Sequence, residues 1–514
     1  MIVRQPRLQT TGRWITLLAF CALTLGLLFL QIYHFRHRDL RLDEILTAHA
    51  GLALSPSQIT LWRAGDIHPP LWTLLGAAWS SLVGLDAGLL RFQSTLYVAL
   101  TLALLYRLGA SLFRPSVGLA AILIAGTWSV FHFYSHEFRP YAPLAMWTVA
   151  CQLAFLWWLR RPGFKTALAF VISGIGIIYT HYFGMYAVAA LALVFVLFVR
   201  WNGPYYLRTF GLFAAIGLAY SPWLLPFVHS FTVTRPRGIE YGVGGSLGAL
   251  RELLGEFAPQ PLALAELLLA ASPLLLLARD RQLSATPTRF RRGWGGGRWR
   301  KAYPMLFAGL VLALALFANQ FVESVTLRNL TLVVPSLALI LAFVLDRMPL
   351  PVRLVGLALL ALPGVTTFTA YERQLPFEDM AVFMAETYTQ GAPIIFNTGR
   401  GPSTNAGLAY NLYDRLPHAQ KQQFIHLSPV TTEIAPDPLP NEVTGSAAAD
   451  VEVFVRLLGA PEQFWYVHAP GDDARGALFL AALGGDYEAV RSRVWNEEDM
   501  LRIGVTEYRR ILES

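Results

Sequence analysis

Apolar runs long enough to cross a bilayer recur along the first 370 residues, and they constrain the fold more than any other feature of the sequence. The first run, "WITLLAFCALTLGLLFLQIY" at 14–33, has the roughly 20 residues that a helix needs to span a hydrocarbon core. Only 14% of the 514 residues are charged, whereas a soluble domain has about 25%. The sequence therefore predicts an all-α polytopic membrane domain over residues 1–370.

The charge and the cysteines of the chain bear on whether it binds nucleic acid, forms disulfides or holds a metal through cysteine. The net charge of +8 does not require a nucleic-acid partner, because Lys and Arg concentrate in the cytoplasmic loops of membrane proteins. Cys21 and Cys151 both fall inside apolar runs, which argues against a disulfide framework and against a cysteine-based metal site.

Basic clusters between the apolar segments predict the topology. The strongest, "RDRQLSATPTRFRRGWGGGRWRK" at 279–301, marks a cytoplasmic loop. Segment 68–86 is short and begins with two prolines, so we expect a helix that lies along the outer surface. The result is about eleven spans plus juxtamembrane helices, with the N-terminus inside and the C-terminal region outside. The basic stretch at 34–41 runs against this assignment.

The character of the sequence changes at residue 371. Short β-like runs appear, with helical stretches such as "EDMAVFMAET" and "AADVEVFVRLLG" between them; the runs are "APIIFNT", "QFIHLS", "QFWYVHA" and "MLRIGVTEY". An alternation of strand and helix patterns is typical of an α/β domain. We therefore expect residues 371–514 to form a small extracytoplasmic α/β domain.

Ionisable and aromatic side chains gather in the loops that this topology places outside. The candidates are Asp43, Glu44, Asp66 and His68 in the first loop, Arg139 and Tyr141 in the second, His181 and Tyr182 in the third, residues 235–241 in the fourth, and Arg328 in the fifth. Arginine binds phosphate through its rigid fork. A carboxylate can deprotonate a hydroxyl group, and His with Asp can hold a divalent metal. The pattern predicts a shared outer cavity for a phosphate-bearing substrate.

Each of these side chains also has a plain structural interpretation. Asp43 and Glu44 would then face lipid headgroups or water, Arg139 and Arg328 would anchor helix ends at the interface, and His68 would cap the next helix. No single motif decides between the two interpretations. The combination of five loops on one face favours the shared cavity.

Several motifs resemble those of GT-C membrane glycosyltransferases, and in particular the bacterial branch related to protein O-mannosyltransferases and the aminoarabinose transferases of lipid A, which is glycosyltransferase family 39-like. The resemblance covers roughly residues 14–345. The matching stretches are "RLDEILTAHA", "DIHPPLW", "RFQSTLYVALTLALLYRLGASLF", "YSHEFRPYA", "THYFG" and "LRNLTLVVP", followed by "PFEDMAVFMAET" and "APIIFN" in the tail. The family often has Arg-Tyr where this chain has Arg328 and Asn329, so the second residue of that motif differs from the family pattern.

The resemblance implies a GT-C-like fold and transfer of a sugar from a polyprenyl-phosphate donor to an acceptor hydroxyl of a glycan, lipid or protein. Asp43 would take the proton from the acceptor hydroxyl or orient that hydroxyl, and Glu44 would be either a helper or a helix-start residue. Substrate contacts would come from Arg139, Tyr141, Arg328, His68 and Tyr182. A divalent metal, where one is bound, would sit at Asp66, His68 and His181. No cofactor is required, because the phosphate of the donor is itself the leaving group.

Two other functions fit parts of the sequence. A surface-polysaccharide polymerase or ligase also has many spans and outer arginines, but it usually carries a large outer loop between late spans. A lipid or solute transporter places ionisable residues near the bilayer midplane, whereas here they lie at the ends of the spans. The transferase is therefore the preferred interpretation, with the chain in the inner membrane of a bacterium.

Overall fold

The structure is a computed structural model. It describes residues 7–33, 40, 42–66, 68–84, 86–199, 203–230, 232, 298–321, 325–326, 328–370, 377–388, 392–397, 424–428, 442–444, 461–468, 481, 483, 485–496 and 502–511. The chain divides into two compact units. The first comprises residues 1–35, 63–75 and 88–371, and the second comprises 36–62, 76–87 and 372–514. Each unit is described by itself.

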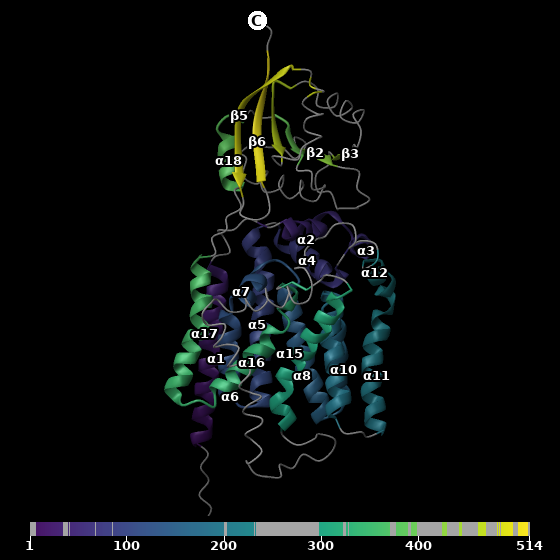
Figure 1. Cartoon of the computed structure of the whole chain (residues 1–514), viewed down its shortest axis with the longest axis vertical. Coiled ribbons are helices and arrows are strands. Elements are labelled where there is room, and N and C mark those ends of the chain that lie inside the picture. The colour runs from purple at the N-terminus through teal and green to yellow at the C-terminus, as the bar shows by residue number, and fades with distance from the viewer. Residues whose placement is uncertain are drawn as a thin grey trace, which may run out of the picture. The chain divides into compact units, whose positions relative to one another are not determined.

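The first unit is a bundle of helices that run side by side (Figure 1). Its helices are α1 (Arg7–Tyr33), α5 (Ala87–Leu112), α6 (Pro115–Thr127), α7 (Ser129–His136), α8 (Tyr141–Arg160), α9 (Phe164–Thr180), α10 (Gly184–Phe198), α11 (Gly203–Tyr220), α12 (Leu224–His229), α15 (Arg298–Asn319), α16 (Val334–Leu345) and α17 (Leu350–Ala370), with the 3₁₀ turns η2 (Ser221–Trp223) and η6 (Arg328–Leu330). Helices suit these segments because in lipid a helix satisfies its own backbone hydrogen bonds.

Among the described residues, four helical segments are long and apolar enough to cross a bilayer. They are Ala87–Leu112, Tyr141–Arg160, Gly203–His229 and Ala302–Asn319. Shorter apolar helices accompany them, among them Trp14–Leu30, Phe164–Thr180 and Gly184–Phe198. The chain is thus mostly helical with several apolar helices, and the total of about eleven spans stays a prediction.

Burial separates central helices from peripheral ones. The apolar window of α8 is 83% buried inside the protein, whereas that of Gly203–His229 is 17% buried. A helix that is apolar all round and buried belongs to the core of a bundle. The peripheral segment instead exposes Leu207, Leu218 and Leu225, which suits contact with lipid chains.

Small residues let α5 and α6 approach closely. A Cβ atom built on Gly118 would lie 2.6 Å from the carbonyl oxygen of Tyr106, and one built on Gly109 would lie 2.9 Å from the Cα atom of Gly118. Both distances are too short for a real side chain, so this crossing requires glycine on both helices. Small residues at such crossings are a common way to pack helices in membranes.

The second unit includes α2 (Leu42–Ala53), and the division between the units cuts through α3 (Pro56–Ala64) and α4 (Pro70–Val83). The hydroxyl of Ser80 donates to the carbonyl oxygen of Ala48 at 2.9 Å and so joins α4 to α2. With 14 residues, α4 is about 21 Å long, which is shorter than the roughly 30 Å hydrocarbon core. Other apolar helices of the chain, such as α6 and α16, are equally short, so the position of α4 along the outer surface stays a prediction.

A six-stranded sheet in the order β3-β2-β1-β4-β6-β5 forms the rest of this unit as far as it is described. Its strands are β1 (Ile394–Asn397), β2 (Phe424–Ser428), β3 (Glu442–Thr444), β4 (Gln463–His468), β5 (Tyr487–Asn496) and β6 (Arg502–Arg510). Strands β3, β2, β1 and β4 are parallel, while β6 is antiparallel to both β4 and β5. Each of the four β-like runs named above contains a strand. The helical stretch expected at 448–459 lies outside the described residues.

One helix, α18 (Phe377–Ala385), packs on this sheet. The ring of Phe383 meets Trp465 at 5.9 Å and Trp495 at 5.6 Å between ring centroids. Behind α18, Thr387 donates to the buried carboxylate of Glu507 at 2.7 Å, and Gln463 donates to the same carboxylate at 2.8 Å. The buried charge is therefore hydrogen-bonded from two sides, as a buried carboxylate must be.

We predict that Gly118→Ala lowers the free energy of unfolding by about 1–3 kcal/mol, the usual cost of overpacking. Gly211→Ala on α11 is the matched control, because a Cβ atom there meets nothing within 4 Å. Thermal unfolding of the purified proteins, followed by circular dichroism, measures the difference. Equal melting temperatures for the two variants would show that α5 and α6 are not in close contact.

Candidate functional site

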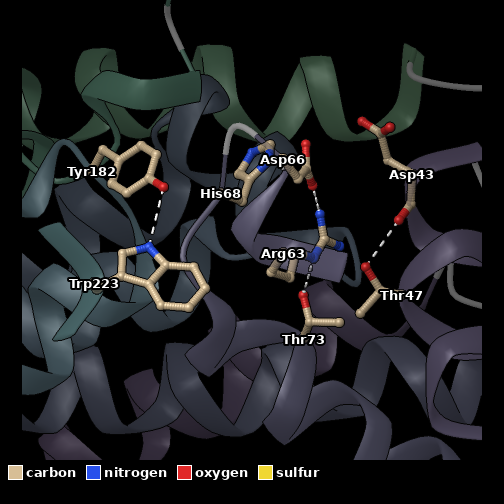
Figure 2. Close-up of polar contacts among 8 residues, drawn as sticks. All are labelled: Asp43, Thr47, Arg63, Asp66, His68, Thr73, Tyr182 and Trp223. Atoms are coloured by element: carbon tan, nitrogen blue, oxygen red, sulfur yellow. Dashed lines mark hydrogen bonds and ion pairs between the residues drawn. The ribbon is translucent and has the colours of Figure 1, made fainter. Parts of the chain in front are cut away.

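Asp43 and Glu44 occupy the first turn of α2 in the second unit. The N-terminus of a helix favours negative charge, because its unpaired N–H groups carry partial positive charge. Glu44 is fully buried, while Asp43 is partly exposed. The backbone carbonyl of Asp43 accepts a hydrogen bond from Thr47 at 3.0 Å (Figure 2). Of the two carboxylates, only that of Asp43 is accessible to a substrate.

A buried arginine, Arg63, organises the loop between α3 and α4 in the first unit. Its Nε atom donates to the hydroxyl of Thr73 at 2.7 Å, and its Nη1 atom pairs with Oδ2 of Asp66 (Figure 2). The same Oδ2 atom lies 3.8 Å from Nδ1 of His68. One guanidinium therefore fixes both ends of the loop, and through Asp66 it fixes the surroundings of His68.

The segment between α7 and α8 carries Arg139. Its backbone is held by Ser94, whose hydroxyl donates to the carbonyl oxygen of Glu137 at 2.6 Å, and by Phe138, whose ring meets that of Trp72 at 5.2 Å. Arg139 is buried, and its guanidinium carbon lies 5.9 Å from the centroid of the Tyr141 ring. The planar fork of N–H donors on arginine matches the oxygens of carboxylate and phosphate groups.

The break between α9 and α10 supplies His181 and Tyr182, which are both buried. The backbone N–H of Phe183 donates to Nδ1 of His181 at 3.2 Å, so Nδ1 acts as an acceptor there. The indole N–H of Trp223 donates to the hydroxyl of Tyr182 at 3.2 Å (Figure 2). Both side chains of this break are thus held in place by hydrogen bonds.

Three of these loops meet within the first unit. The rings of His68 and His181 lie 5.6 Å apart, and those of Tyr141 and His181 lie 6.1 Å apart. His181 is therefore the meeting point of the loop before α4, the segment before α8 and the break before α10. Four of the residues predicted from sequence, namely His68, Arg139, Tyr141 and His181, are linked by these contacts.

The residues considered for a metal do not form a complete set of ligands. Among the described residues, no group of three or more His, Cys, Asp and Glu side chains could hold a metal ion. Asp66 pairs with Arg63, and this cation would compete with a metal for the carboxylate. Asp66, His68 and His181 therefore do not fit a metal site in this arrangement.

Two further predicted regions belong to other parts of the chain. Arg328 begins η6, and its carbonyl oxygen accepts a hydrogen bond from the Thr331 hydroxyl at 2.9 Å. Its contact with a donor phosphate stays a prediction. The fourth loop, residues 235–241, lies outside the described residues.

Sequence reasoning missed Arg63, Thr73 and Trp223. One signal was present for the first, because Arg63 stands three residues before Asp66, and side chains with that spacing meet on a helical turn. Thr73 and Trp223 are ordinary residues in apolar segments, and only the three-dimensional contacts reveal their roles.

No protein-family model and no curated protein matches the sequence of this chain. Solved structures match its fold. ArnT from Cupriavidus metallidurans in the apo state is 15% identical, with 97% of this chain and 98% of ArnT covered and a TM-score of 0.59. The same protein bound to undecaprenyl phosphate is 15% identical, with 96% and 98% covered and a TM-score of 0.55.

The arabinofuranosyltransferase AftD from mycobacteria is also similar. It is 15% identical, with a TM-score of 0.51, and the match covers 98% of this chain but 40% of AftD. ArnT and AftD both have the GT-C fold of glycosyltransferases. The present chain therefore has the GT-C fold, and the resemblance inferred from its sequence is confirmed at the level of fold.

We predict that Asp66→Asn lowers the free energy of unfolding by about 1–3 kcal/mol, because the Arg63 cation stays buried without its carboxylate. In an Arg63→Met background the same change should cost little, since no buried cation is left unpaired. Chemical or thermal unfolding of the two single variants and the double variant measures the coupling. If Asp66→Asn costs the same in both backgrounds, the ion pair does not hold the loop.

Proposed function

We propose that this GT-C-fold chain is a membrane glycosyltransferase that moves a sugar from a polyprenyl-phosphate donor to an acceptor hydroxyl on the outer face of the membrane. The observation that carries the proposal is the meeting of His68, Arg139, Tyr141 and His181 from three separate loops, in a chain that matches ArnT over almost its full length. A fold alone does not establish a function, so the assignment depends on this cluster.

The donor class follows from chemistry and from one comparison. ArnT from Cupriavidus metallidurans has been solved with undecaprenyl phosphate bound. In the present chain, Arg139 is a buried cation whose planar fork matches two phosphate oxygens. We assign Arg139 to the donor phosphate, with Arg328 as a second contact and with Tyr141, Tyr182 and His68 around the sugar.

In the proposed reaction, the Asp43 carboxylate accepts the proton of the acceptor hydroxyl. The hydroxyl oxygen then bonds to the anomeric carbon of the sugar, and the bond from that carbon to the phosphate oxygen breaks. The electron pair leaves with the polyprenyl phosphate, whose negative charge the arginines stabilise. Glu44 acts as a helper within the same helical turn. No step requires a metal.

The placement of the chain belongs to the same proposal. The four long apolar helices support an integral membrane protein. The basic loop at 279–301 supports a cytoplasmic position for that loop. It follows that residues 371–514 form a domain outside the cytoplasm, and we assign the chain to a bacterial inner membrane.

We predict that Asp43→Asn lowers sugar transfer by about a hundred- to ten-thousand-fold, the usual contribution of a general base. Binding of undecaprenyl phosphate to the purified variant should stay unchanged, because Asp43 faces the acceptor in this mechanism. Mass spectrometry of surface glycans and lipid-linked sugars, in cells whose only copy is the variant, reports the transfer. Glu44→Gln is the comparison and should be milder. If cells with the Asp43→Asn variant make the same glycans as the wild type, Asp43 is not the general base and is only a carboxylate that faces lipid headgroups.

We predict that Arg139→Lys weakens binding of undecaprenyl phosphate by about ten-fold or more, because lysine keeps the charge but loses the fork, and a hydrogen bond to a charged group contributes about 1.5 kcal/mol. Arg161→Lys is the matched control, since Arg161 is exposed just beyond the end of α8. Scintillation proximity or native mass spectrometry measures the affinity. Equal affinities for the two variants would remove Arg139 from the donor site.

A further inference from the structure

The turn between α16 and α17 holds Asp346, whose carboxylate contacts arginines from two other segments of the chain. Nε of Arg114 donates to Oδ2 of Asp346 at 2.5 Å, and Nη2 of the same arginine donates to the Asp346 carbonyl oxygen at 3.0 Å. The hydroxyl of Ser116 donates to Oδ1 at 3.0 Å, and Nη1 of Arg353 lies 3.4 Å from Oδ1. The hydrogen bond to Asp346 raises the pKa of Arg114.

A third arginine joins this turn through aromatic rings. The guanidinium carbon of Arg347 lies 4.4 Å from the centroid of the Phe343 ring, and that ring stacks on Phe113 at 4.3 Å. Arg347 is exposed and makes no ion pair with the described residues. Two guanidinium groups therefore contact the single carboxylate of Asp346 and a third belongs to the next residue in the chain, so positive charge is in excess. We call Arg114, Arg347 and Arg353 the basic turn.

The charged groups differ in their access to solvent. The Arg114 side chain is 56% exposed, whereas that of Asp346 is 9% exposed. The carboxylate is thus largely buried and fixes the orientation of Arg114 and Arg353, while the Arg114 side chain remains accessible to solvent. An arginine that is already oriented loses less conformational freedom when it binds an anion.

Directly beyond the basic turn, α17 presents an apolar surface. Leu350, Val352, Leu354, Val355 and Leu359 are each between 45% and 58% exposed. An exposed apolar strip of this kind on a membrane protein is suited to acyl chains. Cation-rich and apolar surfaces are thus adjacent in the chain, and this combination matches a molecule with an anionic head and a hydrocarbon tail.

We propose that the basic turn binds the headgroup of an anionic phospholipid whose acyl chains lie along α17. The site contains none of the residues assigned to sugar transfer. The proposal rests on the placement of the chain in a membrane and not on its enzymatic activity. Each arginine near an anionic membrane surface contributes about 1 kcal/mol, which is about a five-fold change in affinity.

The test is native mass spectrometry of the full-length protein in detergent, titrated with dioleoyl phosphatidylglycerol and, separately, with dioleoyl phosphatidylcholine. The wild-type protein should prefer the anionic lipid. Arg347→Gln should weaken its binding about five-fold and should leave the Asp346 contacts and the melting temperature unchanged, because Arg347 makes none of them. Arg347→Lys keeps the charge and should retain most of the binding. Arg208→Gln, an exposed arginine on α11, is the matched control and should bind as the wild type does.

A second arm separates a lipid from a free phosphate. Dihexanoyl phosphatidylglycerol has the same headgroup but short chains, and it should bind at least ten-fold more weakly than the dioleoyl lipid. Equal affinity for the two would mean that the basic turn recognises a phosphate group alone, against the proposal. Equal affinity for the two dioleoyl lipids, or an unchanged affinity in Arg347→Gln, would overturn it.

Discussion

The solvent around the membrane domain imposes the constraint on which the rest of the structure depends. A hydrocarbon core offers no hydrogen bonds, so each spanning segment must satisfy its own backbone and becomes a helix. Charged side chains are costly within that core and therefore collect at helix ends. In this chain Arg63 ends α3, Arg139 precedes α8 and His181 follows α9. The ionisable side chains of the candidate site are thus found in loops and at helix ends, outside the apolar stretches of the helices.

Loops need support if they are to hold reactive groups in fixed positions, and here buried polar contacts provide it. Arg63 holds the loop before α4 through Thr73 and Asp66. Ser94 and Trp72 hold the segment that carries Arg139. Apart from the Arg63–Asp66 pair, these contacts join residues that lie on different elements of the chain. Such contacts restrict the motion of the loops, and the proposed stabilisation of a leaving phosphate depends on groups that are already in position.

The sequence predicts this architecture where a strong local signal exists. Apolar runs identify the helices, and β-branched and aromatic runs identify strands such as β4. Strand β5 was missed, because "YEAVRSRVWN" mixes charges with exposed valines, and its pairing with β6 decides its structure. From the sequence, His68 and His181 could be placed only on the same face of the membrane domain. Their contact could not be predicted, because the distance between two rings depends on tertiary packing. Arg63 had a local signal in its spacing to Asp66, but its bond to Thr73 depends on how α4 turns back towards α3.

The two arginine sites illustrate how burial decides what an arginine can do. Arg139 is buried against Tyr141, where the effective dielectric is low and an anion is attracted strongly. Such a site suits a single, well-positioned phosphate whose charge changes during a reaction. The basic turn is exposed, so water and salt screen its charges and its binding is weaker and less selective. Weak and less selective binding is sufficient for the headgroup of a lipid that exchanges with the surrounding membrane. In the two proposals, the same residue type thus serves a donor phosphate at one position and a lipid headgroup at the other.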